Sequence, residues 1–120
     1  MSKEYTKYFI TGGAGFIGAH LTNFLLDNST AKVTVYDNFS NGRLYPLESK
    51  IKDDRLEIIN GDVKDLGRLT NAMAGNNVIY HFASNADIAA ATNDPTIDFW
   101  NGTYLTHNVL EAMRINKIKK

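Results

Sequence analysis

The fold of this 120-residue chain is decided by one stretch of its sequence, Thr11-Gly12-Gly13-Ala14-Gly15-Phe16-Ile17-Gly18. The aromatic and β-branched run just before the glycines, residues 8–11, predicts a buried strand. Apolar residues return at helical spacing after Phe16, so the period changes at the glycines. A strand, a glycine-rich turn and an amphipathic helix in this order are typical of a site for the diphosphate of a dinucleotide.

Three glycines of this stretch follow the spacing G-x-x-G-x-x-G, and each has a physical role. Gly12 permits the tight turn, Gly15 lets the backbone approach a diphosphate, and Gly18 lets the helix pack close to the strand. The diphosphate would then rest on free N–H groups at the positive end of the helix dipole. The alternative is a turn that needs its glycines only for packing.

The rest of the chain continues the alternation of strands and helices. Further strands are predicted at residues 32–36, 56–60 and 77–82. A polar loop over 38–54 contains a short helical piece around 44–51. A short helix spans 65–74, with Gly75 as its left-handed end. A long helix begins at Asp94-Pro95 and ends near Arg114 or Ile115. This order predicts an α/β fold, a doubly wound parallel sheet of the Rossmann type with strand order 3-2-1-4.

Apolar spacing predicts which helix faces are buried. The first helix is expected to bury Ile17, Leu21, Phe24 and Leu25. The last helix has one stripe formed by Leu105, Val109, Ala112 and Met113, and a second formed by Ile97, Trp100 and Tyr104. Two stripes indicate either a crowded core or burial of the second stripe against another partner.

Composition excludes several classes of protein. Thirteen Lys and Arg balance 13 Asp and Glu, which argues against a nucleic-acid groove or a polybasic membrane surface. The chain has no cysteine and therefore no disulfide or thiolate site. Since it has neither a long apolar run nor an apolar signal-peptide core after Met1, we expect a cytoplasmic protein. The three histidines lack metal-ligand spacing, so no metal site is predicted.

Two carboxylates follow predicted strands. Asp37 ends the second strand about twenty residues after the glycine motif, where a carboxylate can accept hydrogen bonds from an adenosine ribose. It would repel a 2′-phosphate, so NAD is expected rather than NADP, although Arg43 lies near enough in sequence to serve a phosphate. Asp62, after the third strand, either accepts from an adenine amino group or caps the following helix.

Taken together, the motifs resemble those of extended short-chain dehydrogenases/reductases. Within that family they are most similar to nucleotide-sugar epimerases and dehydratases, UDP-glucose 4-epimerases in particular. The resemblance covers nearly the whole chain and rests on the glycine motif, Asp37-Asn38-Phe39-Ser40-Asn41-Gly42, Gly61-Asp62-Val63, His81-Phe82-Ala83-Ser84 and Asn101-Gly102-Thr103.

The resemblance implies a set of NAD contacts. Gly12, Gly15, Phe16 and Ile17 would hold the diphosphate, and Asp37 and Asn38 the adenosine ribose, with Phe39, Ser40, Asn41 and Gly42 in the loop that follows. Asp62 and Val63 would flank adenine, and Phe82, Ala83 and Ser84 would line the nicotinamide end. Asn101 matches an asparagine that supports the family's proton relay, whereas His81 matches a structural histidine. At Ser84 the family more often has Ala or Gly.

The catalytic pair of the family, a Tyr and a Lys spaced Y-x-x-x-K, is missing, because none of the six tyrosines has a lysine four residues later. We therefore expect the chain to be the amino-terminal cofactor-binding part of an epimerase, without the fifth strand and substrate domain, and inactive alone. In the parent, hydride would pass between the sugar C4 and NAD. Alternatives are a non-catalytic dinucleotide-sensing module, or another reductase or dehydratase such as a dTDP-sugar 4,6-dehydratase.

The resemblance also implies a homodimer formed through the last helix. An independent argument for self-association comes from the predicted sheet, in which the fourth strand, residues 78–82, would leave an open edge.

Overall fold

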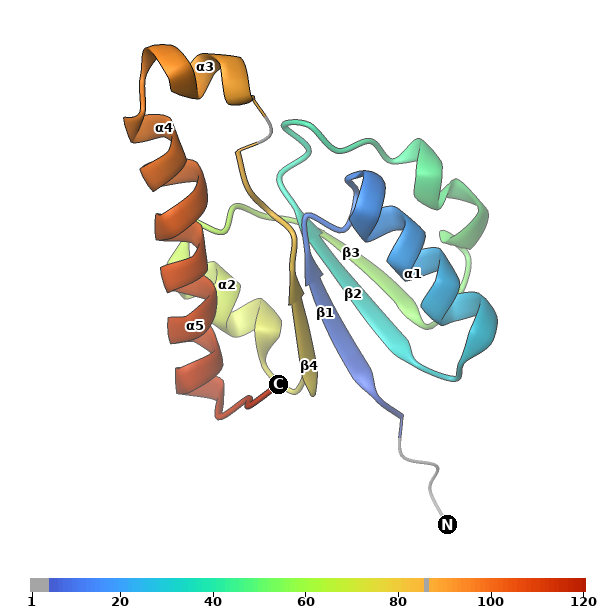
Figure 1. The fold of residues 1–120 in the computed structure, drawn as a ribbon. Coiled ribbons are helices and arrows are strands. Elements are labelled where there is room, and N and C mark those ends of the chain that lie inside the picture. The colour runs from blue at the N-terminus through green and yellow to red at the C-terminus, as the bar shows by residue number, and fades with distance from the viewer. Residues whose placement is uncertain (1–4, 86) are drawn as a thin grey trace.

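Strand β1 (Lys7–Thr11) lies at the centre of the sheet in the computed structural model (Figure 1). It pairs in parallel with β2 (Lys32–Asp37) on one side and with β4 (Val78–His81) on the other. Strand β3 (Leu56–Asn60) extends the sheet beyond β2, again in parallel. The order is therefore β3-β2-β1-β4, which confirms the predicted parallel Rossmann-type sheet with strand order 3-2-1-4.

Helices connect the strands and cover both faces of the sheet. They are α1 (Phe16–Asn28), η1 (Tyr45–Lys50), α2 (Leu66–Met73), α3 (Ile88–Asn93), α4 (Thr96–Asp98), η2 (Phe99–Thr103) and α5 (Tyr104–Asn116). Figure 1 shows α1 and η1 on one face and α2 and α5 on the other. The structure describes residues 5–85 and 87–120, so most of the stretch considered for a signal peptide lies outside it. None of the helices in this part is long and apolar enough to cross a bilayer.

Side-chain alternation along the strands divides the core into two clusters. On β1, Phe9 packs with α2 and α5 while its neighbour Ile10 packs with α1, and both are fully buried. On β2, Tyr36 joins the first cluster and Val35 the second. Because both faces of the sheet are covered, neighbouring residues of the central strands are apolar on both faces, as is usual for parallel sheets.

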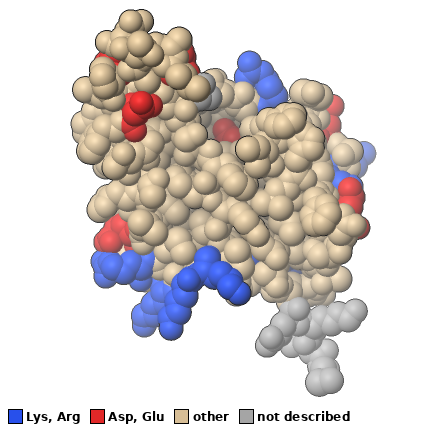
Figure 2. All heavy atoms as spheres, in the orientation of Figure 1, with Lys and Arg blue, Asp and Glu red and all other residues tan. Residues whose placement is uncertain are grey.

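Charged side chains are sparse at the centre of the face shown in Figure 2. Lys and Arg side chains gather at the lower end of this view, where α5 ends with Arg114 in its last turn. Positive charge at this position offsets the negative end of the helix dipole.

The buried face of α1 differs from the predicted one. Ile17 and Phe24 are 63% and 61% exposed. The residues that are buried are Gly18, Ala19, Thr22, Leu25 and Leu26. A Cβ atom on Gly18 would lie 2.4 Å from the carbonyl oxygen of Gly12, so the helix approaches the turn through its smallest residues. This close contact, rather than the largest apolar side chains, sets the rotation of α1 about its axis.

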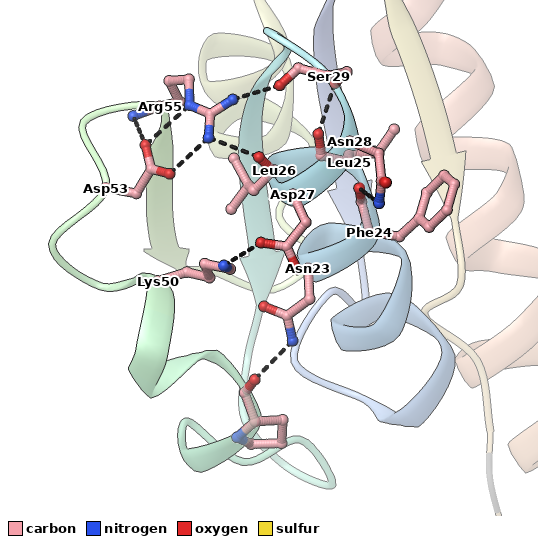
Figure 3. Close-up of polar contacts among 11 residues, drawn as sticks. Asn23, Phe24, Leu25, Leu26, Asp27, Asn28, Ser29, Lys50, Asp53 and Arg55 are labelled. Carbon is pink, nitrogen blue, oxygen red and sulfur yellow. Dashed lines mark hydrogen bonds and ion pairs between the residues drawn. The ribbon is translucent and has the colours of Figure 1, made fainter.

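The carboxyl end of α1 has no basic residue in its last turn and is capped by Arg55, the residue before β3 (Figure 3). The Arg55 guanidinium donates to the carbonyl oxygens of Leu26 and Ser29, at 2.7 and 2.6 Å. It also pairs with Asp53, and this hydrogen bond lowers the pKa of the Asp53 carboxyl. The Asn23 amide donates to the Pro46 carbonyl at 2.9 Å. These contacts fasten the loop that follows β2 to α1.

The last helix begins one residue later than predicted and is less regular than expected. Pro95, predicted as the first helical residue, is the cap of α4, which begins at Thr96, and Asp94 accepts a hydrogen bond from the Thr96 N–H at 3.2 Å. The helix then contains the π-helical turn η2 before α5, and it is preceded by α3, which the sequence did not predict. The predicted stripe of α5 is confirmed, since Leu105, Val109 and Ala112 are buried. The second stripe is not core, because Trp100 is 51% exposed.

The outer edge of β4 is less open than predicted. The Ile79 N–H donates to the carbonyl oxygen of Lys120 at 2.9 Å, and Ile118 packs against the first core cluster. Figure 1 shows the end of the chain beside β4. The expectation of an entirely unpaired edge is therefore wrong at Ile79.

The contact of Gly18 with the turn predicts a contrast between two helical glycines. In Gly18→Ala the added Cβ meets backbone atoms of Gly12 and Gly13, whereas at Gly67 its nearest neighbour is 3.8 Å away. We expect Gly18→Ala to lower the free energy of unfolding by about 1–3 kcal/mol. Gly67→Ala should raise it by up to about 1 kcal/mol through helix propensity. Urea denaturation of both variants tests this, and equal stabilities would contradict it.

Candidate functional site

A cleft of about 900 Å³ lies at the carboxyl ends of the strands, between the glycine turn and the start of the last helix. In open α/β sheets, ligands bind outside this edge, where the strand order reverses. All predicted site residues except Phe39 line the cleft: Gly12, Gly15, Phe16, Ile17, Asp37, Asn38, Ser40, Asn41, Gly42, Asp62, Val63, Phe82, Ala83, Ser84 and Asn101.

Phe39 belongs to the loop but not to the lining of the cleft. Its side chain packs against the core cluster beneath α1. Its φ of 59° is in the left-handed region, and its N–H donates to Asp37 Oδ1 at 2.7 Å. That hydrogen bond helps to hold a backbone conformation that is unusual for a bulky residue.

The turn after β1 depends on Gly12. Its φ of +67° suits glycine, and a Cβ atom there would lie 2.7 Å from the Ala83 nitrogen. The Gly12 N–H donates to the Tyr36 carbonyl at 2.9 Å. Gly12 therefore joins the ends of three neighbouring strands, so its role is larger than that of a tight turn alone.

The amino end of α1 faces the cleft with free hydrogen-bond donors. Among residues 5–85 and 87–120, none accepts a hydrogen bond from the backbone N–H of Phe16, Ile17 or Gly18. No side chain caps this end, and its first turn has no acidic residue. Free N–H groups at the positive end of a helix dipole suit a diphosphate or a similar anion.

Asp37 connects the glycine turn to the loop after β2. The residue is only 8% exposed, and its Oδ2 accepts from the Ala14 N–H at 3.0 Å. Each carboxylate oxygen has a second lone pair, so Asp37 can also accept from a ligand hydroxyl in the cleft. Arg43, the residue considered for a phosphate, does not line the cleft, and its guanidinium donates to the Gly42 carbonyl at 3.1 Å.

The loop after β3 shows which acid caps the next helix. Asp65 caps α2, because its Oδ1 accepts from the Arg68 N–H at 3.1 Å. The alternative reading of Asp62 as this cap is therefore wrong. Asp62 accepts instead from the Lys64 N–H at 2.9 Å, and its exposed side chain lines the cleft.

Two buried polar side chains, neither of them predicted from the sequence, hold this loop by hydrogen bonds to its backbone. The Tyr36 hydroxyl donates to the Asp62 carbonyl at 3.0 Å, and burial raises the pKa of this phenol. The Asn108 amide, on α5, donates to the Val63 carbonyl at 2.9 Å and is 2% exposed. An asparagine within the apolar stripe of the last helix was the available signal, since buried amides need partners.

The nicotinamide end predicted from the resemblance lies where β4 meets the last helix. Asn101 and Gly102, both in the π-helical turn η2, line the cleft there, and such turns often occur at functional sites. His81 ends β4 with both ring nitrogens within hydrogen-bond distance of threonine hydroxyls, and burial lowers its pKa. Sequence reasoning did not place the other lining residues: Gly18, Tyr36, Gly61, Lys64, Asn85, Gly102, Leu105 and Thr106.

The described residues contain no cluster of three or more His, Asp or Glu side chains that could hold a metal ion. The cleft presents backbone amides and the carboxylates of Asp37 and Asp62 among its lining groups, which suit a polar, anionic ligand with hydroxyl groups.

Comparison with known proteins agrees with this geometry. Residues 8–120 match the model of the NAD dependent epimerase/dehydratase family. The chain is 35% identical to a probable UDP-arabinose 4-epimerase of Arabidopsis thaliana, over 96% of this chain and 29% of the relative. It is 29% identical to a dTDP-glucose 4,6-dehydratase of Mycolicibacterium smegmatis, over 94% of this chain and 34% of the relative.

A solved structure is also similar. DesIV, a dTDP-glucose 4,6-dehydratase from Streptomyces venezuelae solved with NAD and TYD bound, superposes with a TM-score of 0.87 at 27% identity. The match covers 94% of this chain and 37% of DesIV. The chain thus spans about a third of the length of the proteins it matches.

Proposed function

Because the chain belongs to the NAD-dependent epimerase/dehydratase family, we propose that its cleft binds NAD and that it is the cofactor-binding part of a nucleotide-sugar 4-epimerase. One observation carries the proposal: the free N–H groups of residues 16–18 and the Asp37 carboxylate line the same cleft. A diphosphate and a ribose diol need these two kinds of partner at the two positions.

Each part of the cofactor has a counterpart among the lining residues. The start of α1 would receive the diphosphate, and Asp37 would accept from the adenosine ribose. Adenine would lie beside Asp62 and Val63, in the loop that Tyr36 and Asn108 hold. The backbone of residues 82–84 would border the nicotinamide. NAD supplies the hydride acceptor, and the chain's own residues bind and orient it.

The reaction proposed for the whole protein is epimerisation at the sugar C4, with UDP-glucose as the type of substrate. The similarity to a UDP-arabinose 4-epimerase supports a sugar nucleotide and a 4-epimerase. The chain itself has no Y-x-x-x-K pair. The residue that would move the substrate proton is therefore not among these 120 residues, and Asn101 is the one proposed member of a proton relay.

A second candidate is a dTDP-sugar 4,6-dehydratase, favoured by the similarity to the mycobacterial enzyme and to DesIV. Both candidates use the same cofactor site. The products formed from UDP- and dTDP-sugars by a longer protein that contains this chain separate them, because an epimer keeps the mass of its substrate and a dehydration product loses water.

Self-association through the last helix is part of the proposal. Trp100 contacts Phe99 and Tyr104 in edge-to-face geometry, with ring centroids 5.0 and 5.3 Å away. Phe99 and Trp100 are each 51% exposed, and Leu110 is 60% exposed. This aromatic surface suits a second copy of the chain, because packing two such faces together would remove apolar area from water.

The first prediction is that cofactor choice follows Asp37. The unmodified chain should bind NAD more tightly than NADP by at least about tenfold, because a 2′-phosphate would face the carboxylate. Asp37→Ala should lower this ratio of NAD affinity to NADP affinity. Asp62→Asn, at the adenine end, should weaken both ligands alike and leave the ratio unchanged. Calorimetric titration measures the affinity of each of the three proteins for NAD and for NADP, and NADP binding equal to NAD in the unmodified chain would refute the assignment.

A second prediction is that the purified 120-residue chain binds NAD but does not convert UDP-sugars. Loss of a general acid–base alone lowers a rate about 10²–10⁴-fold. Product analysis by NMR after long incubation provides the measurement, and calorimetry on the same sample shows that the cofactor site is intact. Measurable turnover would show that the chemistry does not need the missing pair.

The third prediction concerns the aromatic surface. Trp100→Glu should shift the chain toward the monomer in light scattering across a concentration series. Phe24→Glu, which places the same charge on the exposed side of α1, should leave the association state as it is. A monomeric unmodified chain at high concentration would argue against the proposed dimer.

A further inference from the structure

His81 is an ionisable side chain of the cleft that the proposed NAD contacts do not use. It ends β4, and its ring lies between β1 and the last helix. Its Nδ1 is 2.7 Å from the Thr11 hydroxyl, and its Nε2 is 3.3 Å from the Thr106 hydroxyl. A histidine ring between two hydroxyls can be in either neutral tautomer, so the neighbours must decide which one is present.

The hydrogen-bond partners of Thr11 decide which tautomer of His81 is present. The Thr11 hydroxyl oxygen accepts from two backbone N–H groups, those of Phe82 at 3.1 Å and Ala83 at 3.2 Å, the former shared with the Thr11 carbonyl. Backbone amides only donate, and a hydroxyl has two lone pairs and one proton. Both lone pairs are thus used, and the Thr11 proton must point at Nδ1. Nδ1 is therefore an acceptor, and the neutral ring carries its proton on Nε2.

The remaining hydrogen bonds run in the same direction. Nε2–H donates to the Thr106 hydroxyl, which in turn donates to the Gly102 carbonyl at 3.3 Å. A proton on both ring nitrogens would leave Nδ1–H facing an oxygen without a free lone pair. Burial also lowers the pKa of His81, which keeps the ring neutral near pH 7.

We infer that His81, as the Nε2–H tautomer, is a positioning residue that links the backbone of residues 82–83 to the π-helical turn η2. Thr11 lies at one end of this hydrogen-bond chain and Gly102 at the other. These hydrogen bonds border only the end of the cleft where β4 meets the last helix. The start of α1 and Asp62, at the far end, do not take part in it.

This inference predicts a selective loss of affinity for NAD, and this prediction rests on the proposed NAD site. Thr106→Val keeps the shape of an exposed residue and removes the acceptor for Nε2–H. The affinity for NAD should fall about three- to tenfold, the worth of one neutral hydrogen bond. ADP-ribose, which lacks nicotinamide, should lose less than about twofold. Thr106→Ser should restore NAD affinity, and His81→Phe should reproduce the loss.

Thr103→Val is the matched control, because Thr103 is exposed on the same helix and does not line the cleft. It should leave both affinities unchanged. Equal losses in Thr103→Val and Thr106→Val, equal losses for NAD and ADP-ribose, or no rescue by serine would overturn the positioning role.

The tautomer has a test that needs no ligand. Long-range ¹H–¹⁵N correlation spectra of the histidine rings should show His81 with its proton on Nε2 and a bare Nδ1. His20 provides contrast within the same spectrum, since its Nδ1 is 2.7 Å from the Phe16 carbonyl and must donate. A proton on Nδ1 of His81 would overturn the inference. If the unmodified chain bound no NAD, the proposed function and the affinity effect would fail together, while the spectra would still decide the hydrogen-bond chain.

Discussion

The contact of α1 with the glycine turn is the constraint on which the rest of the molecule depends. At Gly18 the helix lies so close to the backbone of Gly12 and Gly13 that a single methyl group would overlap with it. That approach fixes the rotation of α1, which leaves Phe16 and Ile17 exposed, and it holds the first turn of the helix, with its free N–H groups, at the cleft.

Three further parts of the cleft wall are loops, and each is held by a side chain from a distant part of the sequence. Asp37 holds the glycine turn, Asn108 the loop after β3, and Thr11 the backbone after β4. Every one of these side chains satisfies backbone groups that would otherwise need water. The polar interior thus serves to position backbone atoms, and the ligand would meet mostly backbone and small side chains.

The sequence predicted the features that depend on local pattern. Strand order, the glycine turn and the positions of Asp37 and Asp62 follow from spacing along the chain, and the family resemblance located most of the cleft lining. Prediction was wrong where packing decides between similar patterns. Apolar spacing favoured Ile17 and Phe24 for the core, but the close contact of Gly18 with the glycine turn rotates the helix so that both side chains are exposed. Asn108 and the hydrogen bonds of His81 were missed because their partners are remote in sequence, and α3 because its exposed residues carry no periodic signal.

The pairing of β1 with β4 has a consequence for how the molecule folds. Thr11 and His81 are 70 residues apart, and the strands that carry them are neighbours in the sheet. Contacts of such separation close large loops, so we expect them to form after local helices and the β1–β2 unit. The floor of the cleft is complete only once β4 has docked. The glycine turn, encoded near the start of the chain, therefore acquires its binding geometry at the end of folding, and a ligand that needs both ends of the cleft stabilises only the finished sheet.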